Sequence, residues 1–152
     1  MTAATRKVAI IDGGGANIAS LQFALRRLGA EGELTADPAT IRAASHVILP
    51  GVGAACAAMD RLRATGLPEV IRSLTQPVLG ICLGMQLLYT RSEEDDAECL
   101  GIIPGTVRRL LPAAGRPVPH MGWNQLVAIE GRSRLLEGVD EGSYVYFVHG
   151  YA

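Results

Sequence analysis

The feature that most constrains this chain is the junction between Val78 and Gln86, where a compact apolar run passes into a helix-like one with a cysteine between them. A strand that turns directly into a helix makes a sharp, strained bend, and the residues two positions before and after the bend must be small to avoid clashes. Gly80 and Gly84 occupy those positions around Cys82. The pattern predicts a nucleophile elbow with Cys82 at its tip.

The alternative interpretation of Cys82 is an ordinary buried core cysteine, which is what most free cysteines are. A strand, two flanking glycines and a following helix together favour the nucleophile. The amino end of that helix would place partial positive charge at the sulfur and favour the reactive thiolate. Attack on an amide builds negative charge on its oxygen, which backbone N–H groups stabilise. We expect the Leu83 N–H as one donor and the glycine-rich turn Pro50–Gly53, otherwise a plain connector, to supply the other.

The same alternation of apolar strand and helix recurs along the first half of the chain. Strands are expected at 7–11, 46–49 and 78–82, and helices with inward apolar faces follow at 17–28, 54–65 and 83–89. Parallel strands need such crossovers, so the pattern predicts an α/β fold with a mostly parallel sheet and helices on both faces. Ligands bind such sheets at the carboxyl ends of the strands.

The second half has a different character. Residues 91–98 read as a charged loop, and residues 101–128 alternate short strand-like pieces with Gly and Pro, which favours antiparallel pairing. Residues 144–148 form a last apolar run that we interpret as a buried parallel strand, which would normally lead into a covering helix.

Length and composition exclude several classes of protein. A chain of 152 residues, 49% of them hydrophobic, is expected to form one domain over residues 1–152. Fourteen basic against fifteen acidic side chains give no reason to expect nucleic acid or a membrane surface as a partner. The apolar run Val8–Ile11 is too short for a signal peptide or a membrane span, so we expect a cytoplasmic protein. Three cysteines without a C-x-x-C pair predict reduced thiols, and no metal or cofactor is expected.

The elbow G-I-C-L-G-M-Q (80–86) and the turn P-G-V-G (50–53) resemble those of the class I (triad) glutamine amidotransferases. CTP synthase and GMP synthetase carry related elbows. Four further segments are similar to the glutaminase subunit of imidazole glycerol phosphate synthase: 11–17, 48–59, L-G-I-I-P-G-T-V-R-R-L (100–110) and, most specifically, P-H-M-G-W-N (119–124). The resemblance covers nearly all residues and implies a flavodoxin-like or Rossmann-like sheet.

The resemblance implies a role for each matching residue. Cys82 would form a thioester with the side chain of glutamine, and Val52 and Leu83 would give the oxyanion-hole amides. The substrate-binding positions would be Gly51, Gly53, Gln86, Val148, Gly150 and Tyr151. Ammonia would pass to a (β/α)₈-barrel cyclase subunit, which makes imidazole glycerol phosphate and an aminoimidazole carboxamide ribotide (AICAR) in histidine biosynthesis. Met121, Trp123 and Asn124 would contact that subunit, although a lone tryptophan is often partly buried in its own core.

The chain departs from this family in three places. Relatives have a tyrosine in the first loop where this chain has Gly13, and its loss should loosen the loop. Gly150 replaces a serine, with little expected effect. The third departure concerns the base histidine and its glutamate, which lie in a later His-Pro-Glu segment that the 152 residues do not contain. We therefore expect the 152 residues to be a C-terminally truncated part of a longer protein and to be nearly inactive.

None of the three histidines replaces the missing base convincingly. His120 is interpreted as structural, His46 begins a strand at the wrong end of the sheet, and His149 is a weak candidate because a base must also be oriented. One alternative function is a catalytically dead module that docks on a cyclase. Another is dinucleotide binding at Gly13–Gly15, which the third glycine position of the fingerprint, Ile18, disfavours.

Overall fold

A computed structural model describes residues 6–15, 17–127 and 134–152. The chain divides into two compact units, Met1–Arg108 and Arg109–Ala152, and each is described by itself. The predicted single domain stays a prediction.

The first unit is built on a four-stranded sheet whose strands all run parallel. The strands are β1 (Arg6–Ile11), β2 (Ala30–Thr35), β3 (His46–Gly51) and β4 (Val78–Cys82), in the order β2-β1-β3-β4. Three of them confirm the predicted strands. The edge strand β2 was not predicted, because its sequence A-E-G-E-L-T lacks a compact apolar run and its pairing with β1 is what makes it a strand.

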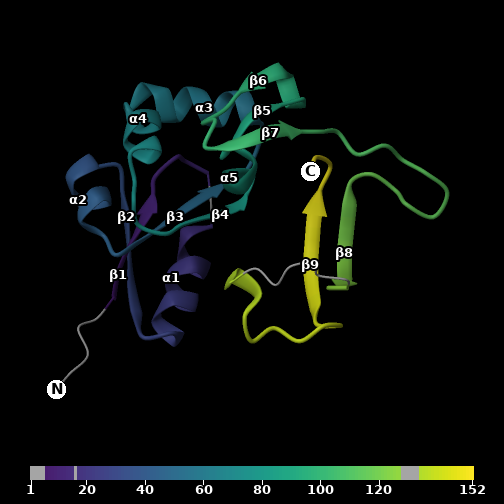
Figure 1. Cartoon of the computed structure of the whole chain (residues 1–152), viewed down its shortest axis with the longest axis horizontal. Helices are drawn as coiled ribbons and strands as arrows, with labels where there is room; N and C mark the ends of the chain where they lie inside the picture. The colour runs from purple at the N-terminus through teal and green to yellow at the C-terminus, as the bar shows by residue number, and fades with distance from the viewer. Residues whose placement is uncertain (1–5, 16, 128–133) are drawn as a thin grey trace. The chain divides into compact units, whose positions relative to one another are not determined.

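Helices cover both faces of this sheet, as predicted (Figure 1). Val8, Ile10 and Ile48 pack against α1 (Ile18–Arg27), and their sequence neighbours in β1 and β3 pack on the other face. That second face carries α2 (Pro38–Ala43), α3 (Ala55–Ala64) and α4 (Leu67–Arg72). Successive strand residues point to opposite faces, so one compact apolar strand serves two cores.

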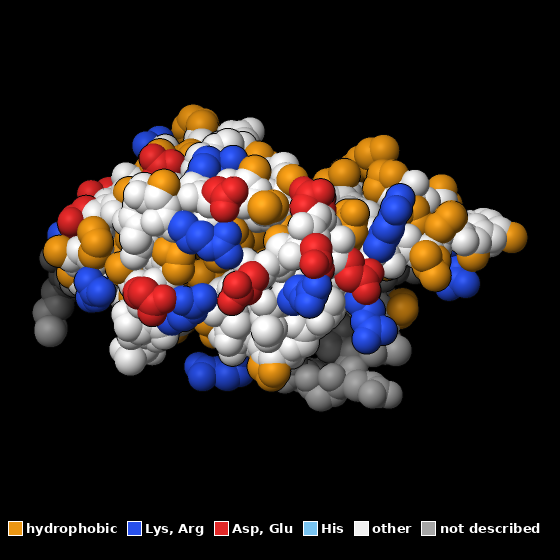
Figure 2. All heavy atoms as spheres, turned by 90° about the horizontal axis from the view of Figure 1, so that it is seen from above, with side chains coloured by type: hydrophobic (Ala, Val, Ile, Leu, Met, Phe, Trp, Pro, Cys, Tyr) orange, Lys and Arg blue, Asp and Glu red, His pale blue; other side chains and the backbone are white. Residues whose placement is uncertain are grey.

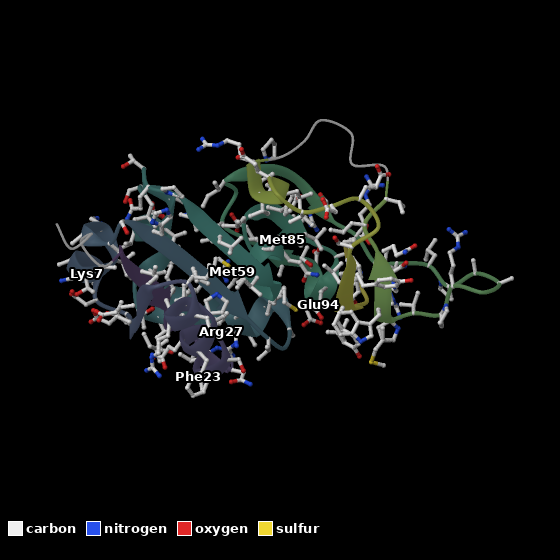
Figure 3. All side chains as sticks on the ribbon, turned by 90° about the horizontal axis from the view of Figure 1, so that it is seen from below. Lys7, Phe23, Arg27, Met59, Met85 and Glu94 are labelled. Atoms are coloured by element: carbon white, nitrogen blue, oxygen red, sulfur yellow. The ribbon has the colours of Figure 1, made fainter. Side chains whose placement is uncertain are left out.

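The helices show their inward and outward faces clearly. Met59 of α3 lies in the interior, whereas Phe23 and Arg27 project outward from α1 (Figure 3). The side chain of Asn17 caps α1 by accepting the Ser20 N–H. The inward apolar face predicted for the helix over 17–28 includes its last residue, Leu28, which is instead 80% exposed because it lies at the C-cap, where the helix ends.

The helix predicted over 83–89 is shorter than expected. It is one turn, α5 (Leu83–Gln86), and Tyr89 begins the strand β5 (Tyr89–Ser92). The carbonyls of Leu87, Leu88 and Tyr89 accept N–H groups of residues 100–103, so they cannot continue the helix. This pairing is long-range, and the local sequence does not indicate it.

The expected charged loop 91–98 also contains regular structure. The end of β5 leads through the 3₁₀ helix η1 (Glu94–Asp96) into β6 (Ala97–Glu98). β5 pairs antiparallel with β6 and parallel with β7 (Ile103–Val107), which gives a second, three-stranded sheet.

The second unit contains an antiparallel pair, β8 (His120–Gln125) and β9 (Tyr144–His149), and the 3₁₀ helix η2 (Arg134–Leu136). The predicted antiparallel character is confirmed here. The prediction that 144–148 is a buried parallel strand is wrong, since Tyr144, Tyr146 and Val148 are all more than half exposed. Only alternate side chains of this run are partly buried, which is typical of an antiparallel sheet with one open face.

Acidic and basic side chains intersperse over the described part of the face shown in Figure 2. That distribution agrees with the near-zero net charge of the sequence. Among the described residues, no helix has both the length and the apolar character needed to cross a bilayer.

Candidate functional site

The tip of the elbow has the strained backbone expected of a nucleophile. Cys82 lies between β4 and α5 with φ 53° and ψ −122°, and it is exposed. Side chains other than glycine rarely adopt a positive φ, and such conformations cost about 1–3 kcal/mol and cluster at functional sites. The bend thus presents the sulfur to solvent. The single turn of α5 is shorter than the helix predicted to direct positive charge at it.

Glycines around the bend meet a steric requirement that the sequence predicts. A Cβ on Gly84 would lie 1.8 Å from the Leu49 carbonyl oxygen, and one on Gly80 would lie 2.4 Å from the Met85 Cα. Real Cβ atoms essentially never approach within 3.0 Å. The predicted need for small residues on both sides of Cys82 is confirmed.

The turn after β3 lies beside the elbow. Gly51 pairs in register with Cys82, so Val52 and Leu83 follow paired positions at the carboxyl edge of the sheet. A Cβ on Gly51 would come within 2.8 Å of the Gly84 N, which shows how closely the two turns pack. The arrangement supports the two predicted oxyanion donors, whose role stays a prediction. Gln86 is buried on α5 at 8% exposure, so it would have to reach substrate from within the elbow.

The sequence did not predict the carboxylate that caps α3, the helix that follows the oxyanion turn. The Oε2 atom of Glu94 in η1 accepts the Ala55 N–H at 2.9 Å, at the start of α3, and Figure 3 labels this residue. The N-cap residue Ala54 has no side chain that could cap α3. A helix start without Ser, Thr, Asp or Asn was the available signal for a distant cap.

A second missed contact holds the first loop. Arg61 of α3 donates from Nε to the Gly13 carbonyl oxygen at 2.7 Å. A Cβ on Gly15 would lie 3.2 Å from the Val52 Cγ2, so this loop also touches the oxyanion turn. Ala16 lies outside the described residues, and the predicted loosening of the loop stays a prediction.

In the second unit, strand register separates the predicted interface residues. Met121 and Trp123 share one face with Tyr146 and Val148, and Trp123 makes an edge-to-face contact with Tyr146 at 5.6 Å between ring centroids. Asn124 projects from the opposite face, so one flat surface would not take all three predicted side chains.

The remaining predicted pocket residues end β9 and follow it. The Gly150 carbonyl accepts the Leu110 N–H at 2.9 Å, and the Tyr151 carbonyl accepts from His149. Val148 pairs with Met121 in the ladder. Contacts of these backbone groups with glutamine stay predictions.

The histidines form a connected pair in the same unit. His149 Nδ1 lies 3.0 Å from the Tyr151 carbonyl oxygen, so it is the donor, and its Nε2 then accepts from His120 Nδ1 at 3.2 Å. His120 also stacks on Phe147. These contacts support a structural role for His120 and occupy both ring nitrogens of His149, which disfavours it as a base. His46 begins β3, at the opposite end of that strand from Gly51, as predicted.

The other two cysteines differ from Cys82. Cys99 is buried, and desolvation raises the pKa of its thiol, while Cys56 is half-buried on α3. Within the described ranges, no three His, Cys, Asp or Glu side chains gather as a metal site would require.

Comparisons with known proteins identify the family of this chain. The model of the family described as glutamine amidotransferase class-I matches residues 9–152. The imidazole glycerol phosphate synthase subunit HisH of Xanthomonas axonopodis pv. citri is 58% identical over 145 residues, 95% of this chain and 72% of that protein. The HisH subunit of Xylella fastidiosa (strain Temecula1) is 54% identical over 146 residues, 96% and 72% respectively. A crystal structure of a glutamine amidotransferase superposes with a TM-score of 0.70 at 21% identity, over 93% of this chain and 70% of that one, which concerns the fold.

Proposed function

Because the chain belongs to the class-I glutamine amidotransferases, and among them to the HisH subunits of imidazole glycerol phosphate synthase, we propose that it hydrolyses glutamine to glutamate and ammonia with Cys82 as nucleophile. The observation that carries the proposal is the exposed thiol at a strained bend, registered with Gly51 of the neighbouring glycine-rich turn.

In the proposed mechanism the Cys82 thiolate attacks the side-chain carbonyl carbon of glutamine. The negative charge that develops on the oxygen is received by the N–H groups of Val52 and Leu83, which follow paired strand positions. Collapse of this intermediate breaks the C–N bond, the nitrogen takes up a proton, and ammonia leaves a thioester on the sulfur. Water then attacks the thioester to give glutamate and the free thiol.

Six residues are proposed to bind the substrate. Gly51 and Gly53 would shape the oxyanion turn, Gln86 would bind from α5, and backbone groups of Val148, Gly150 and Tyr151 would contact the α-amino and carboxylate groups. None of these residues is proposed as the general base. The 152 residues do not contain the family's His-Pro-Glu segment.

The ammonia would be consumed by a cyclase subunit in a heterodimer. Met121 and Trp123, 62% and 70% exposed, offer an apolar face for that partner, and Asn124 would contact it from the other side of β8. Channelling of ammonia into a barrel-shaped cyclase, the lyase step there, and a cytoplasmic location belong to the same proposal.

The substitution Cys82→Ala tests the nucleophile in the protein encoded by the whole gene, bound to its cyclase. Glutamine-dependent turnover should fall by roughly three orders of magnitude or more, because no thioester can form, while turnover with added ammonium salts should persist. Both rates are measured from glutamate release and product formation. The control is Cys56→Ala, which should keep both.

Two outcomes would count against the enzyme. Glutamine-dependent turnover that survives Cys82→Ala would remove Cys82 from the mechanism. A wild-type complex that forms but never releases glutamate would favour the docking module instead.

A further inference from the structure

Arg61 connects two segments that lie 48 positions apart in the sequence. Its Nε donates to the Gly13 carbonyl oxygen at 2.7 Å, and its side chain runs beside Gly14, where a Cβ would lie 3.2 Å from the Arg61 Cδ. The neighbouring Leu62 also reaches Gly13, where a Cβ would lie 3.6 Å from the Leu62 Cδ2. The middle of α3 therefore packs on the first loop.

The same loop packs on the turn that would supply an oxyanion donor. A Cβ on Gly15 would lie 3.2 Å from the Val52 Cγ2, which is tighter than most real contacts, so the Gly15 backbone lies directly beside the Val52 side chain. Val52 is 45% exposed, so neighbouring residues enclose its side chain only in part. The position of the loop and that of the oxyanion turn are thus linked by contact.

Three consecutive glycines need an external restraint to keep one conformation. Gly14 and Gly15 have φ values of 76° and 86°, and glycine loses more backbone freedom on ordering than any other residue. The other hydrogen bonds of the loop are local, from the Gly14 N–H to Asp12 and from the Gly13 N–H to Ile11. Among the described residues, the bond from Arg61 is the one that ties this loop to a helix.

We propose that Arg61 is a positioning residue for the oxyanion hole: it fixes the Gly13–Gly15 loop against Val52 and so keeps the Val52 N–H directed at the developing charge. The proposal rests on the proposed function. Oxyanion donors act more strongly in the transition state than on bound substrate, so their misplacement lowers kcat and leaves KM unchanged.

Three variants of the complete protein, each bound to its cyclase, separate this role from general stability. Arg61→Met keeps the apolar stem that covers Gly14 but has no donor. Arg61→Lys restores a donor, one bond beyond the position of Nε. Arg63→Met is the matched control, because Arg63 is an exposed residue of the same helix whose guanidinium binds Asp60 and the Glu98 carbonyl.

Each variant is assayed for glutamine turnover per reactive Cys82 thiol, which is counted by iodoacetamide labelling and mass spectrometry. Arg61→Met should lower kcat about tenfold, the effect of losing one charge-assisted hydrogen bond, with KM unchanged. Arg61→Lys should recover most of the loss, and Arg63→Met should change kcat less than about twofold. The rate of iodoacetamide alkylation should not change, because that displacement builds no charge on a carbonyl oxygen.

Amide hydrogen exchange gives a second readout that does not depend on turnover. Exchange at residues 13–15 and at Val52 should be faster in Arg61→Met than in Arg63→Met. The proposal is overturned if exchange at Val52 is the same in both, or if alkylation of Cys82 slows as much as kcat, which would mean a general distortion of the elbow. If the wild-type protein has no Cys82-dependent turnover, the proposed function is wrong. The exchange comparison would still test whether Arg61 positions the loop and Val52.

Discussion

The elbow between β4 and α5 and the antiparallel β8–β9 pair are stabilised in different ways. The elbow is fixed by its own unit, since Gly84 packs closely against the Leu49 carbonyl and the neighbouring strand β3 is packed on both faces. The β8–β9 pair exposes Met121, Trp123, Tyr144 and Tyr146 on one face. A reactive thiol needs a conformation that the chain itself imposes, whereas an exposed aromatic face gains its free energy only when something covers it.

The difference concerns where the stabilising contacts come from. At the elbow a strained Cys82 persists because the surrounding packing over-determines it. A two-stranded sheet has few contacts of its own and is marginal in isolation, so side chains such as Trp123 are available for a partner. Substitutions should therefore act on folding in the first region and on association in the second.

The largest effect is expected from Gly84→Ala. The new methyl group would overlap the Leu49 carbonyl oxygen, which belongs to backbone on a buried strand and cannot move aside. The free energy of unfolding should fall by about 4 kcal/mol or more, measured by urea denaturation of the complete protein. The control is Gly29→Ala, where a Cβ meets nothing within 4 Å and only the positive φ costs about 1 kcal/mol. Equal losses in the two variants would mean that close packing does not fix the elbow.

An intermediate effect, on association only, is expected from Trp123→Ala. Its side chain is 70% exposed, so the free energy of unfolding should change by about 1 kcal/mol or less, mainly through the Tyr146 contact. The affinity for the cyclase should weaken by about 2 kcal/mol or more, roughly thirtyfold, as for a central aromatic anchor. Calorimetric titration measures it.

Asn124→Ala sharpens the same comparison because Asn124 lies on the opposite face of β8. If the partner covers only the aromatic face, its affinity should change by about 0.5 kcal/mol or less. Comparable losses of affinity for Asn124→Ala and Trp123→Ala would show that the partner contacts both faces of β8. If neither substitution weakens the affinity for the cyclase, the β8–β9 pair is not part of the interface.

The two regions also differ in how far the sequence predicts them. Gly80, Cys82 and Gly84 are close in sequence and obey a local steric rule, so the elbow can be predicted from its residues. The contacts of Glu94 with Ala55 and of Arg61 with Gly13 join distant segments, and the local sequence does not identify these partners, although the uncapped start of α3 signals the need for a distant cap. The exposure of β9 was mispredicted for a related reason, because an apolar run looks the same whether a sheet or a partner covers it.

A smaller effect than those of Gly84→Ala and Trp123→Ala is expected from a pair of substitutions at Cys82 itself. Glycine tolerates φ 53° with ψ −122°, whereas alanine keeps a Cβ and most of the strain. If the elbow stores strain to present its thiol, Cys82→Gly should have a free energy of unfolding about 1 kcal/mol higher than Cys82→Ala, measured by urea denaturation. Both variants lack the thiol, so the difference reports the backbone alone. A glycine variant no more stable than the alanine variant would mean that the bend is relaxed, and that Cys82 is presented by packing without a cost in stability.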